Sequence, residues 1–272
     1  MPAEGRADSG TGAGRVGGAV EGVIGWVTFD RPQRHNAMSY EMWQGLPEVL
    51  AAHEADPAVK AIVLRGAGEK AFISGADISQ FEARRASAAA NEDYRTVAAR
   101  AFERLRDAPK PTIAMIRGYC IGGGLAIALC CDLRIAADDG RFGIPAARLG
   151  LGYAQDGVKR LIDVVGPAYT KEILFTGRRY EADEAWRIGL LNRVVPVAAL
   201  EDEVREIAGT IGGNAPLTIA AAKRAVNDLM LPAGEQDPDA VRAAVERCFD
   251  SEDFAEGRKA FAEKRRPVFK GR

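Results

Sequence analysis

Three consecutive glycines, Gly122-Gly123-Gly124, lie inside an apolar stretch that reads GYCIGGGLAIALCCD from residue 118 to residue 132. A strand that turns directly into a helix leaves the first helical N–H groups without intrahelical acceptors, and the helix dipole favours negative charge in front of them. Glycine has no Cβ, so a ligand oxygen can approach its backbone closely. The run therefore predicts either an oxyanion site at the start of a helix over residues 125–129, or close packing of that helix against a neighbouring element.

A second stretch, ISGAD over residues 73–77, has the same character. It follows a short apolar segment, and its small side chains again leave backbone N–H groups accessible. Two such sites, each following one of two neighbouring strands, could converge on a single oxygen atom, which is the geometry of an oxyanion hole. The two stretches together favour the oxyanion interpretation over packing alone.

The surrounding segments predict the elements that must hold these stretches in place. Short apolar runs are typical of buried strands, and they cover residues 25–30, 61–66, 112–118 and 133–137. Ser39 is a favourable N-cap for a first helix, and a second helix is expected from about Asn91. Alternating strands and helices indicate an α/β fold.

The pattern changes after about residue 199, where the chain becomes almost entirely helical. Helices are expected over residues 200–211, 216–229, 239–249 and 251–264. The first nineteen residues are rich in Gly and Ala and lack the apolar stretch of a signal peptide, which predicts a disordered tail. Residues 12–17 match G-x-G-x-x-G, but no strand precedes them, so we do not expect a dinucleotide site. The predicted organisation is a disordered tail (1–19), an α/β core (20–199) and a C-terminal helical region (200–272).

Composition excludes several classes of partner. The formal net charge of the 272 residues is −1, so no global field attracts nucleic acid or an anionic membrane surface, and no apolar run is long enough to span a bilayer. The cysteines lack metal-ligand spacing, and three of the four lie in the apolar run or just before it, which favours buried free thiols over disulfides or a catalytic metal. Free thiols indicate a reducing compartment, and we expect a cytoplasmic protein. The cysteines are Cys120, Cys130, Cys131 and Cys248.

Three blocks of the chain resemble the signature blocks of the crotonase, or enoyl-CoA hydratase/isomerase, superfamily. These are KAFISGADISQF (70–81), the glycine-containing stretch and FGIPAARLGL (142–151). VTFDRPQRHNAMS (27–39) is similar to the first strand and CoA-binding loop of that family, and the resemblance extends from about residue 25 to the C-terminus. It implies a spiral of ββα units with a C-terminal helical region, assembled as a homotrimer or a dimer of trimers. It also implies an acyl-CoA substrate and no separate cofactor, because coenzyme A is part of that substrate.

The resemblance also assigns site residues by position. The oxyanion donors would be the backbone N–H groups of Ala76 and Gly123, which would stabilise developing enolate charge on a thioester oxygen. The positions that contact coenzyme A in family members correspond to Gln33, Arg34, His35, Ser74, Ala76, Asp77 and Ile78, with Phe261 and Lys264 near the C-terminus. His35 has an alternative interpretation as an ordinary solvated loop histidine.

The chain departs from the family at two positions that matter for catalysis. Hydratases of the family use two glutamates to add water across an enoyl-CoA, and these positions hold Ala126 and Ala146 here. A methyl group cannot transfer a proton or orient a water molecule. The resemblance therefore implies an acyl-CoA enzyme for which the ordinary two-glutamate hydration is not available.

Two polar residues after the third block are candidates for the missing proton chemistry. Tyr153 falls where decarboxylases of the methylmalonyl-CoA type carry a tyrosine, although those enzymes keep the first glutamate. Asp156 is the nearest carboxylate, and it could act as an acid or base if buried. A packing aromatic and a helix N-cap are the alternative interpretations of Tyr153 and Asp156. Three functions stay open: an enzyme acting on an unusual acyl-CoA, a decarboxylase of a malonyl-type thioester, and an acyl-CoA-binding protein without catalysis.

Overall fold

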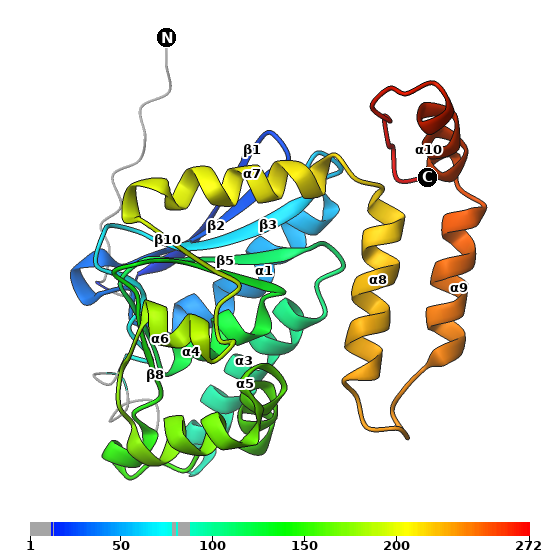
Figure 1. Cartoon of the computed structure of the whole chain (residues 1–272). Coiled ribbons are helices and arrows are strands. Elements are labelled where there is room, and N and C mark those ends of the chain that lie inside the picture. The colour runs from blue at the N-terminus through cyan, green and yellow to red at the C-terminus, as the bar shows by residue number, and fades with distance from the viewer. Residues whose placement is uncertain (1–11, 13, 78–79, 81–87) are drawn as a thin grey trace.

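The structure, a computed structural model, describes Gly12, residues 14–77, Gln80 and residues 88–272, with only the backbone of residues 88–91 (Figure 1). Within these ranges no helix combines the length and the apolar character needed to cross a membrane. Strand β1 (Arg15–Glu21) pairs antiparallel with β2 (Ile24–Asp30). The expected disordered tail is therefore wrong for residues 15–19, where backbone pairing to a buried neighbour orders a glycine-rich segment.

Six strands form the larger sheet, in the order β1-β2-β3-β5-β7-β10. All neighbours except β1 and β2 pair in parallel. The remaining bounds are β3 Ala61–Gly66, β5 Thr112–Ile116, β7 Leu133–Ala137 and β10 Arg193–Val195. The four predicted strands are confirmed, with ends displaced by two residues at most.

A smaller sheet contains four short strands in the order β4-β6-β8-β9. They are β4 Ala71–Ile73, β6 Tyr119–Ile121, β8 Arg141–Gly143 and β9 Tyr180–Glu181. The chain repeats one unit three times: a strand of the larger sheet, then a strand of the smaller sheet, then a helix. The three units are β3-β4-α3, β5-β6-α4 and β7-β8-α5. The expected spiral of ββα units is thereby confirmed.

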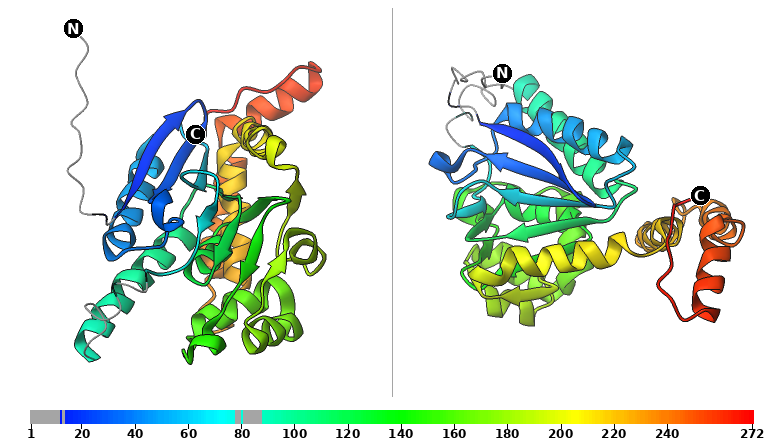
Figure 2. Two further views of the ribbon diagram at one scale, coloured as in Figure 1. Left: turned by 90° about the vertical axis from the view of Figure 1, so that its left-hand side faces the viewer. Right: turned by 90° about the horizontal axis from the view of Figure 1, so that it is seen from above.

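Helices cover both faces of the larger sheet. The helices on one side of it are α1 Tyr40–Ala55, α3 Ala88–Arg106, α4 Gly123–Cys130, α5 Gln155–Thr176 and α6 Ala182–Arg187. Of these, α1 contacts β1 and β2 directly, whereas α4 contacts β4 and β6 of the smaller sheet. As predicted, Ser39 caps α1, and its Oγ accepts a hydrogen bond from the Met42 N–H at 3.3 Å. On the other face, α7 (Leu200–Gly212) buries Leu200, Val204 and Ala208 against the strands, which forms a second core (Figure 2).

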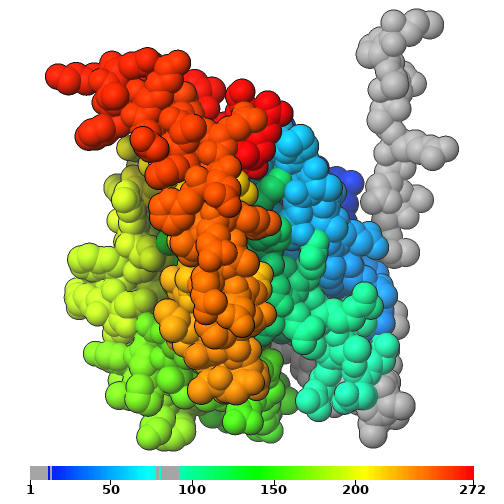
Figure 3. Space-filling model, turned by 90° about the vertical axis from the view of Figure 1, so that its right-hand side faces the viewer, coloured from blue at the N-terminus to red at the C-terminus, as the bar shows by residue number. Residues whose placement is uncertain are grey.

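The last three helices form an arm that projects from this body (Figure 1). We call α8 (Pro216–Leu229), α9 (Pro238–Phe249) and α10 (Glu252–Ala262) the C-terminal arm. Figure 3 shows α9 and α10 on the outer surface of this side of the molecule. Lys223 joins α8 to the body through an ion pair with Asp132, with 2.7 Å between Nζ and Oδ2. The predicted C-terminal helices are confirmed, although α7 packs on the sheet and does not belong to the arm.

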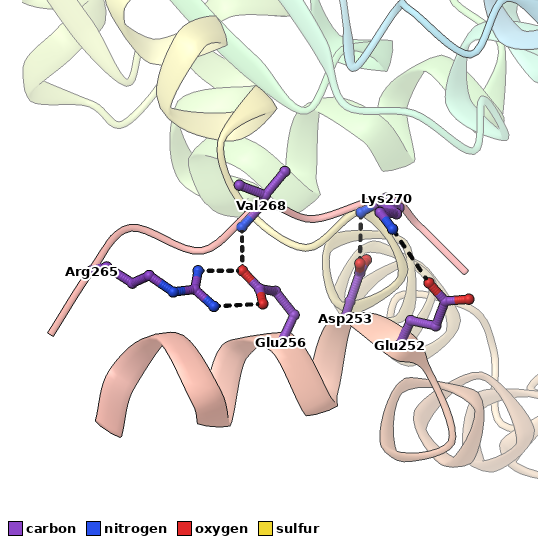
Figure 4. A pocket seen from close by; sticks show the side chains of 6 residues that line it. All are labelled: Glu252, Asp253, Glu256, Arg265, Val268 and Lys270. Carbon is purple, nitrogen blue, oxygen red and sulfur yellow. Dashed lines mark hydrogen bonds and ion pairs between the residues drawn. The ribbon is translucent and has the colours of Figure 1, made fainter. Parts of the chain in front are cut away.

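Beyond α10 the chain folds back along that helix. Asp253 accepts hydrogen bonds from the N–H groups of Lys270 and Gly271, and Glu256 accepts one from Val268 N–H while pairing with Arg265. These groups surround a cavity of about 310 Å³ (Figure 4). Because its carboxylates are already bound by the chain itself, we regard this cavity as part of the terminal fold rather than as a substrate site.

Candidate functional site

The three glycines follow β6 and open α4, as the strand-to-helix prediction requires. Gly122 is the N-cap and has φ of 54°, a left-handed conformation that favours glycine, and its N–H donates to the Gly143 carbonyl at 2.8 Å. At Gly124 an added Cβ would lie 2.2 Å from the Ile73 carbonyl oxygen. The packing interpretation is therefore correct for Gly124, where α4 touches β4 backbone to backbone.

Gly123 occupies a more open position. An added Cβ would lie 3.6 Å from Trp43 Cζ2 and 3.7 Å from the Ala76 nitrogen, which are ordinary contact distances. Gly123 is the first residue of α4, where an N–H has no intrahelical acceptor. The structure thus brings Gly123 and Ala76, both predicted from the sequence, side by side.

The loop that contains Ala76 is held by an isolated β-bridge to Met38, which leaves the Ala76 N–H without a partner among the described residues. Met38 N–H donates to Gly75 at 2.8 Å, and Asp77 N–H donates to Met38 at 2.9 Å, so the neighbours of Ala76 make the backbone bonds. Among the described residues, neither the Ala76 N–H nor the Gly123 N–H has an acceptor. Two adjacent unpaired donors, one of them at a helix N-terminus, can stabilise an oxyanion.

Asp77 lies beneath this loop and forms an ion pair that sequence reasoning missed. Its Oδ2 lies 2.6 Å from Nη1 of Arg31, and both side chains are less than a tenth exposed. Arg31 also donates to the Ala37 carbonyl, at 3.3 Å. The Asp77 side chain thus ties the Ala76 loop to the loop before α1. No spacing in the sequence relates residue 31 to residue 77, so only the fold reveals the pair.

Other residues predicted to hold coenzyme A lie on the surface next to this loop. Gln33, Arg34 and His35 are exposed in and after a short 3-10 turn (Pro32–Arg34). The His35 carbonyl accepts from Ser74 N–H at 3.1 Å, and Ser74 Oγ lies 3.4 Å from the Arg34 carbonyl. His35, Arg34 and Ser74 therefore form one surface.

The His35 ring stacks on Tyr119, with centroids 6.0 Å apart and planes inclined by 20°. His35 is therefore an exposed loop residue, as its alternative interpretation expects, with one ring face against Tyr119. Ile78, also predicted to contact coenzyme A, lies outside the described residues.

Phe261 and Lys264 are not brought to the same place within one chain. Phe261 is 88% exposed near the end of α10, and Lys264 follows that helix with φ of 53°. The arm that carries them projects away from β4, β6 and α4 (Figures 1 and 2). Any role of these two residues at this site therefore requires a second copy of the chain.

The two alanines stand where the resemblance places catalytic glutamates. Ala126 is three residues after Gly123, on the same face of α4, and is 6% exposed. Ala146 begins a 3-10 turn (Ala146–Leu149) before α5 and is half-buried. Neither position offers a group that could take up a proton.

Tyr153 lies just before α5 and is partly buried against the main core. Its ring fills the space next to Gly157, where an added Cβ would meet ring carbon Cε1 at 2.8 Å. Burial raises the pKa of the Tyr153 phenol to about 12 because the charged phenolate is poorly solvated there. The group is therefore a neutral hydrogen-bond donor across the physiological range.

Asp156 does not have the buried environment that an acid or base was expected to have. Its side chain is 65% exposed and pairs with Arg160 at 3.0 Å, one turn later on α5. The N-cap interpretation is also wrong, because α5 starts at Gln155 and Ala154 occupies the cap position. Of the two candidates, only Tyr153 is partly enclosed.

Trp43, which lies beside Gly123, and the Tyr94 and Phe102 rings that contact it were predicted only as parts of helix faces. Trp43 is 3% exposed, and its indole N–H donates to Tyr94 Oη at 2.8 Å. The Phe102 ring meets Trp43 edge to face, with centroids 5.0 Å apart. Apolar periodicity places such residues in a core, and no sequence signal separates a core aromatic from a pocket wall.

No group of three His, Cys, Asp or Glu side chains in the described part of the chain could hold a metal ion. The four cysteines are free thiols, as predicted, and three of them are buried. Burial raises the pKa of the Cys130 thiol to about 11, so this thiol stays protonated. Cys130 is therefore a buried packing residue and not a thiolate nucleophile.

Comparison with known proteins agrees with this geometry. The family model for enoyl-CoA hydratase/isomerase matches residues 19–272. A short-chain-enoyl-CoA hydratase of Clostridium acetobutylicum is 38% identical over 90% of this chain and 94% of its own length. A carnitinyl-CoA dehydratase of Proteus mirabilis is 38% identical over 93% of this chain and 97% of its own.

The solved structure of an enoyl-CoA hydratase/carnithine racemase from Magnetospirillum magneticum superposes with a TM-score of 0.88 at 39% identity, covering 94% of this chain and 96% of that one. The family model and both relatives thus span nearly the whole chain, including the paired N–H groups. The chain therefore belongs to the enoyl-CoA hydratase/isomerase family of the crotonase superfamily.

Proposed function

We propose that this protein is an enzyme that binds an acyl-CoA thioester and stabilises an enolate-type intermediate in an oxyanion hole. The hole consists of the Ala76 and Gly123 N–H groups. The observation that carries the proposal is their position: they lie next to each other and have no acceptor among the described residues. Donors of this kind act where charge develops on the thioester oxygen.

The reaction is not the two-glutamate hydration. The relatives include proteins named as hydratases and dehydratases. This chain has methyl groups at Ala126 and Ala146, which cannot activate water. We infer a lyase or isomerase reaction in which the two backbone N–H groups hold the enolate and the neutral Tyr153 donates the proton that quenches it. Where a proton must first leave the α-carbon, solvent water takes it up.

A decarboxylase of a malonyl-type thioester is the second candidate. In that reaction the bond between the α-carbon and the carboxylate breaks, carbon dioxide leaves, and the electron pair forms the thioester enolate. The α-carbon then takes up a proton. This sequence needs enolate stabilisation and a proton donor but no base, which suits a phenol that burial keeps protonated.

Gln33, Arg34, His35, Ser74 and the backbone near Asp77 are proposed to contact the coenzyme A portion. This assignment is supported by the position of Gln33, Arg34, His35 and Ser74, which lie on one surface beside Ala76. Phe261 and Lys264 are proposed to contact coenzyme A bound by a neighbouring copy in a trimer or a dimer of trimers, since the arm carries them away from their own site.

The test uses purified protein with a panel of enoyl-, hydroxyacyl- and malonyl-type CoA thioesters, read by mass spectrometry. We expect turnover of at least one thioester and negligible hydration of crotonyl-CoA. Loss of carbon dioxide would identify the decarboxylase. Binding without turnover of any thioester would identify a non-catalytic acyl-CoA-binding protein and reject the proposed enzyme.

Gly123→Pro tests the site itself. Proline lacks the N–H and is well tolerated at the first residue of a helix, so the fold should persist. We expect kcat on the best substrate to fall by roughly 10²–10³-fold, as for other oxyanion donors. A folded variant that turns over substrate at the wild-type rate would contradict the assignment of Gly123.

A further inference from the structure

The edge of the Trp43 indole lies beside the proposed oxyanion hole. Trp43 Cζ2 would be 3.6 Å from a Cβ on Gly123, and the Ala76 nitrogen would be 3.7 Å from the same atom. The indole and the two N–H groups therefore surround one small space. We expect an acyl chain attached to a carbonyl held there to start beside this indole.

The indole cannot easily move aside. Its N–H donates to Tyr94 Oη at 2.8 Å, and both residues are at most 5% exposed. Rotating the ring would leave a buried donor and a buried hydroxyl without this bond, which is costly. Trp43 is therefore a rigid wall and not an adaptable side chain.

Two more side chains continue the wall behind Trp43. Phe102, from α3, meets the indole edge to face at 5.0 Å between centroids, and the Arg160 guanidinium lies 5.1 Å from the centre of the Phe102 ring. The Arg160 side chain is 15% exposed. A chain that extended past Trp43 in this direction would have to displace a packed ring and a largely buried cation.

We propose that Trp43 is a specificity-determining residue that restricts the acyl group to short chains. The inference rests on the proposed function, because it assumes that a thioester carbonyl lies at Ala76 and Gly123. The small Ala126 leaves room for the first carbons of the acyl group, and the indole stops its extension. The expected substrates are thioesters of about the size of butyryl-CoA, rather than octanoyl-CoA.

Binding of saturated thioesters tests this without requiring turnover. We would measure Kd for butyryl-CoA, octanoyl-CoA and coenzyme A by calorimetry with wild type, Trp43→Leu and the milder Trp43→Phe. In an open apolar channel each added methylene improves affinity by roughly fourfold. We expect wild type to bind octanoyl-CoA no more tightly than butyryl-CoA, and Trp43→Leu to shift that preference toward octanoyl-CoA by at least tenfold.

Trp186→Leu is the matched control, since Trp186 is 52% exposed on α6 and the same substitution there should leave the preference unchanged. Thermal melts identify folded variants, and Trp43→Phe should give a smaller shift in the same direction if Trp43→Leu does not fold. The proposal would be overturned if wild type bound octanoyl-CoA more tightly than butyryl-CoA. It would also be overturned if a folded Trp43 variant had the same ratio of the two Kd values as wild type. Failure of wild type to bind any thioester would instead reject the proposed function on which it rests.

Discussion

At Gly124 an added Cβ would lie 2.2 Å from the Ile73 carbonyl oxygen, whereas at Gly123 its nearest neighbour would be 3.6 Å away. The first contact is with backbone, which cannot rotate aside. Gly124 is therefore needed so that α4 can sit against β4, and that contact places the N-terminus of α4 beside Ala76. Gly123 is needed for a different reason, because its open side is where a ligand oxygen can approach.

Gly124→Ala should consequently destabilise the fold by at least about 2 kcal/mol, in the range that overpacking of a core costs. Gly123→Ala should change the free energy of unfolding by much less, because its Cβ meets neighbours at ordinary distances. Urea unfolding of both variants and wild type measures the difference. Equal destabilisation by the two substitutions would contradict the separate roles.

Tyr153→Phe tests the phenol that we propose as proton donor, which of the two candidates, Tyr153 and Asp156, is the partly enclosed one. Because general acid–base help contributes about 10²–10⁴-fold, we expect kcat to fall by roughly that factor while the melting temperature stays within a few degrees. Tyr169→Phe, which removes an exposed hydroxyl further along α5, is the control and should have full activity. Full activity of Tyr153→Phe would show that another group or water carries the proton.

The raised pKa of Tyr153 also makes the stability of the folded protein depend on pH. A phenol with a pKa of about 12 stays neutral in the folded protein, whereas the unfolded phenol ionises near pH 10. Its stabilising contribution is therefore complete below about pH 10 and is lost as pH rises toward 12. Wild type should lose thermal stability more steeply than Tyr153→Phe in that window.

At the scale of elements, the strands and most helix ends followed from local sequence. Strands β2, β3, β5 and β7 are short, apolar and bounded by turn residues, and such runs are readable without tertiary information. Strand β1 was not predicted, since its glycines gain order only by pairing with β2. The Arg31–Asp77 ion pair likewise depends on two loops that only the fold brings together.

The candidate site, like the fold, was predictable where local sequence carries the signal and not where packing decides. The residues themselves indicated two stretches of small side chains with accessible N–H groups, and the family resemblance assigned Ala76 and Gly123 within them as the donors. The start of α5 is different, because the helix begins two residues earlier than predicted, which moves Asp156 out of the cap position. Trp43 was assigned to a helix face correctly, but which part of that face borders the donors depends on how α1 packs against α4.

The segment after α10 is held by carboxylates and should detach in acid. Arg265, and then the Val268 N–H, hold the pKa of Glu256 down to about 2. A lowered folded-state pKa gives stability that is present above the unfolded value, near 4.3, and is lost as pH falls toward 2. Hydrogen exchange at Val268 N–H should therefore accelerate between pH 4 and pH 2 relative to the body of the protein.

Glu256→Gln should show the faster exchange at Val268 already at neutral pH, since an amide binds Arg265 and the N–H more weakly than a carboxylate. Glu263→Gln is the control, because Glu263 pairs with Arg265 but accepts no backbone N–H of this segment in the described structure. Equal protection in Glu256→Gln and wild type would mean that Asp253 and Glu252 hold the terminus without Glu256.

At the scale of the whole molecule, the C-terminal arm is the least self-sufficient part of the chain. Its three helices bury only four residues, Ala221, Ala244, Asp253 and Ala260. Its exposed surface carries large apolar side chains, which include Val226, Leu229, Phe249 and Phe261. Monomeric proteins rarely expose so many apolar groups together, so we expect another copy of the chain to cover them.

Because the family resemblance implies a trimer or a dimer of trimers, we expect sedimentation equilibrium to give three or six copies of the chain per particle. Leu229→Glu places a charge on a side chain that is 72% exposed in the monomer, and it should shift the mass toward the monomer because a charge buried in an apolar interface costs several kcal/mol. Gln44→Glu adds the same charge at an exposed polar position of α1 and should leave the mass unchanged. If Phe261 and Lys264 serve a neighbouring copy, dissociation by Leu229→Glu should also weaken coenzyme A binding without any change at Ala76 or Gly123. A monomeric wild type with full affinity for coenzyme A would reject both the assembly and that role of the arm.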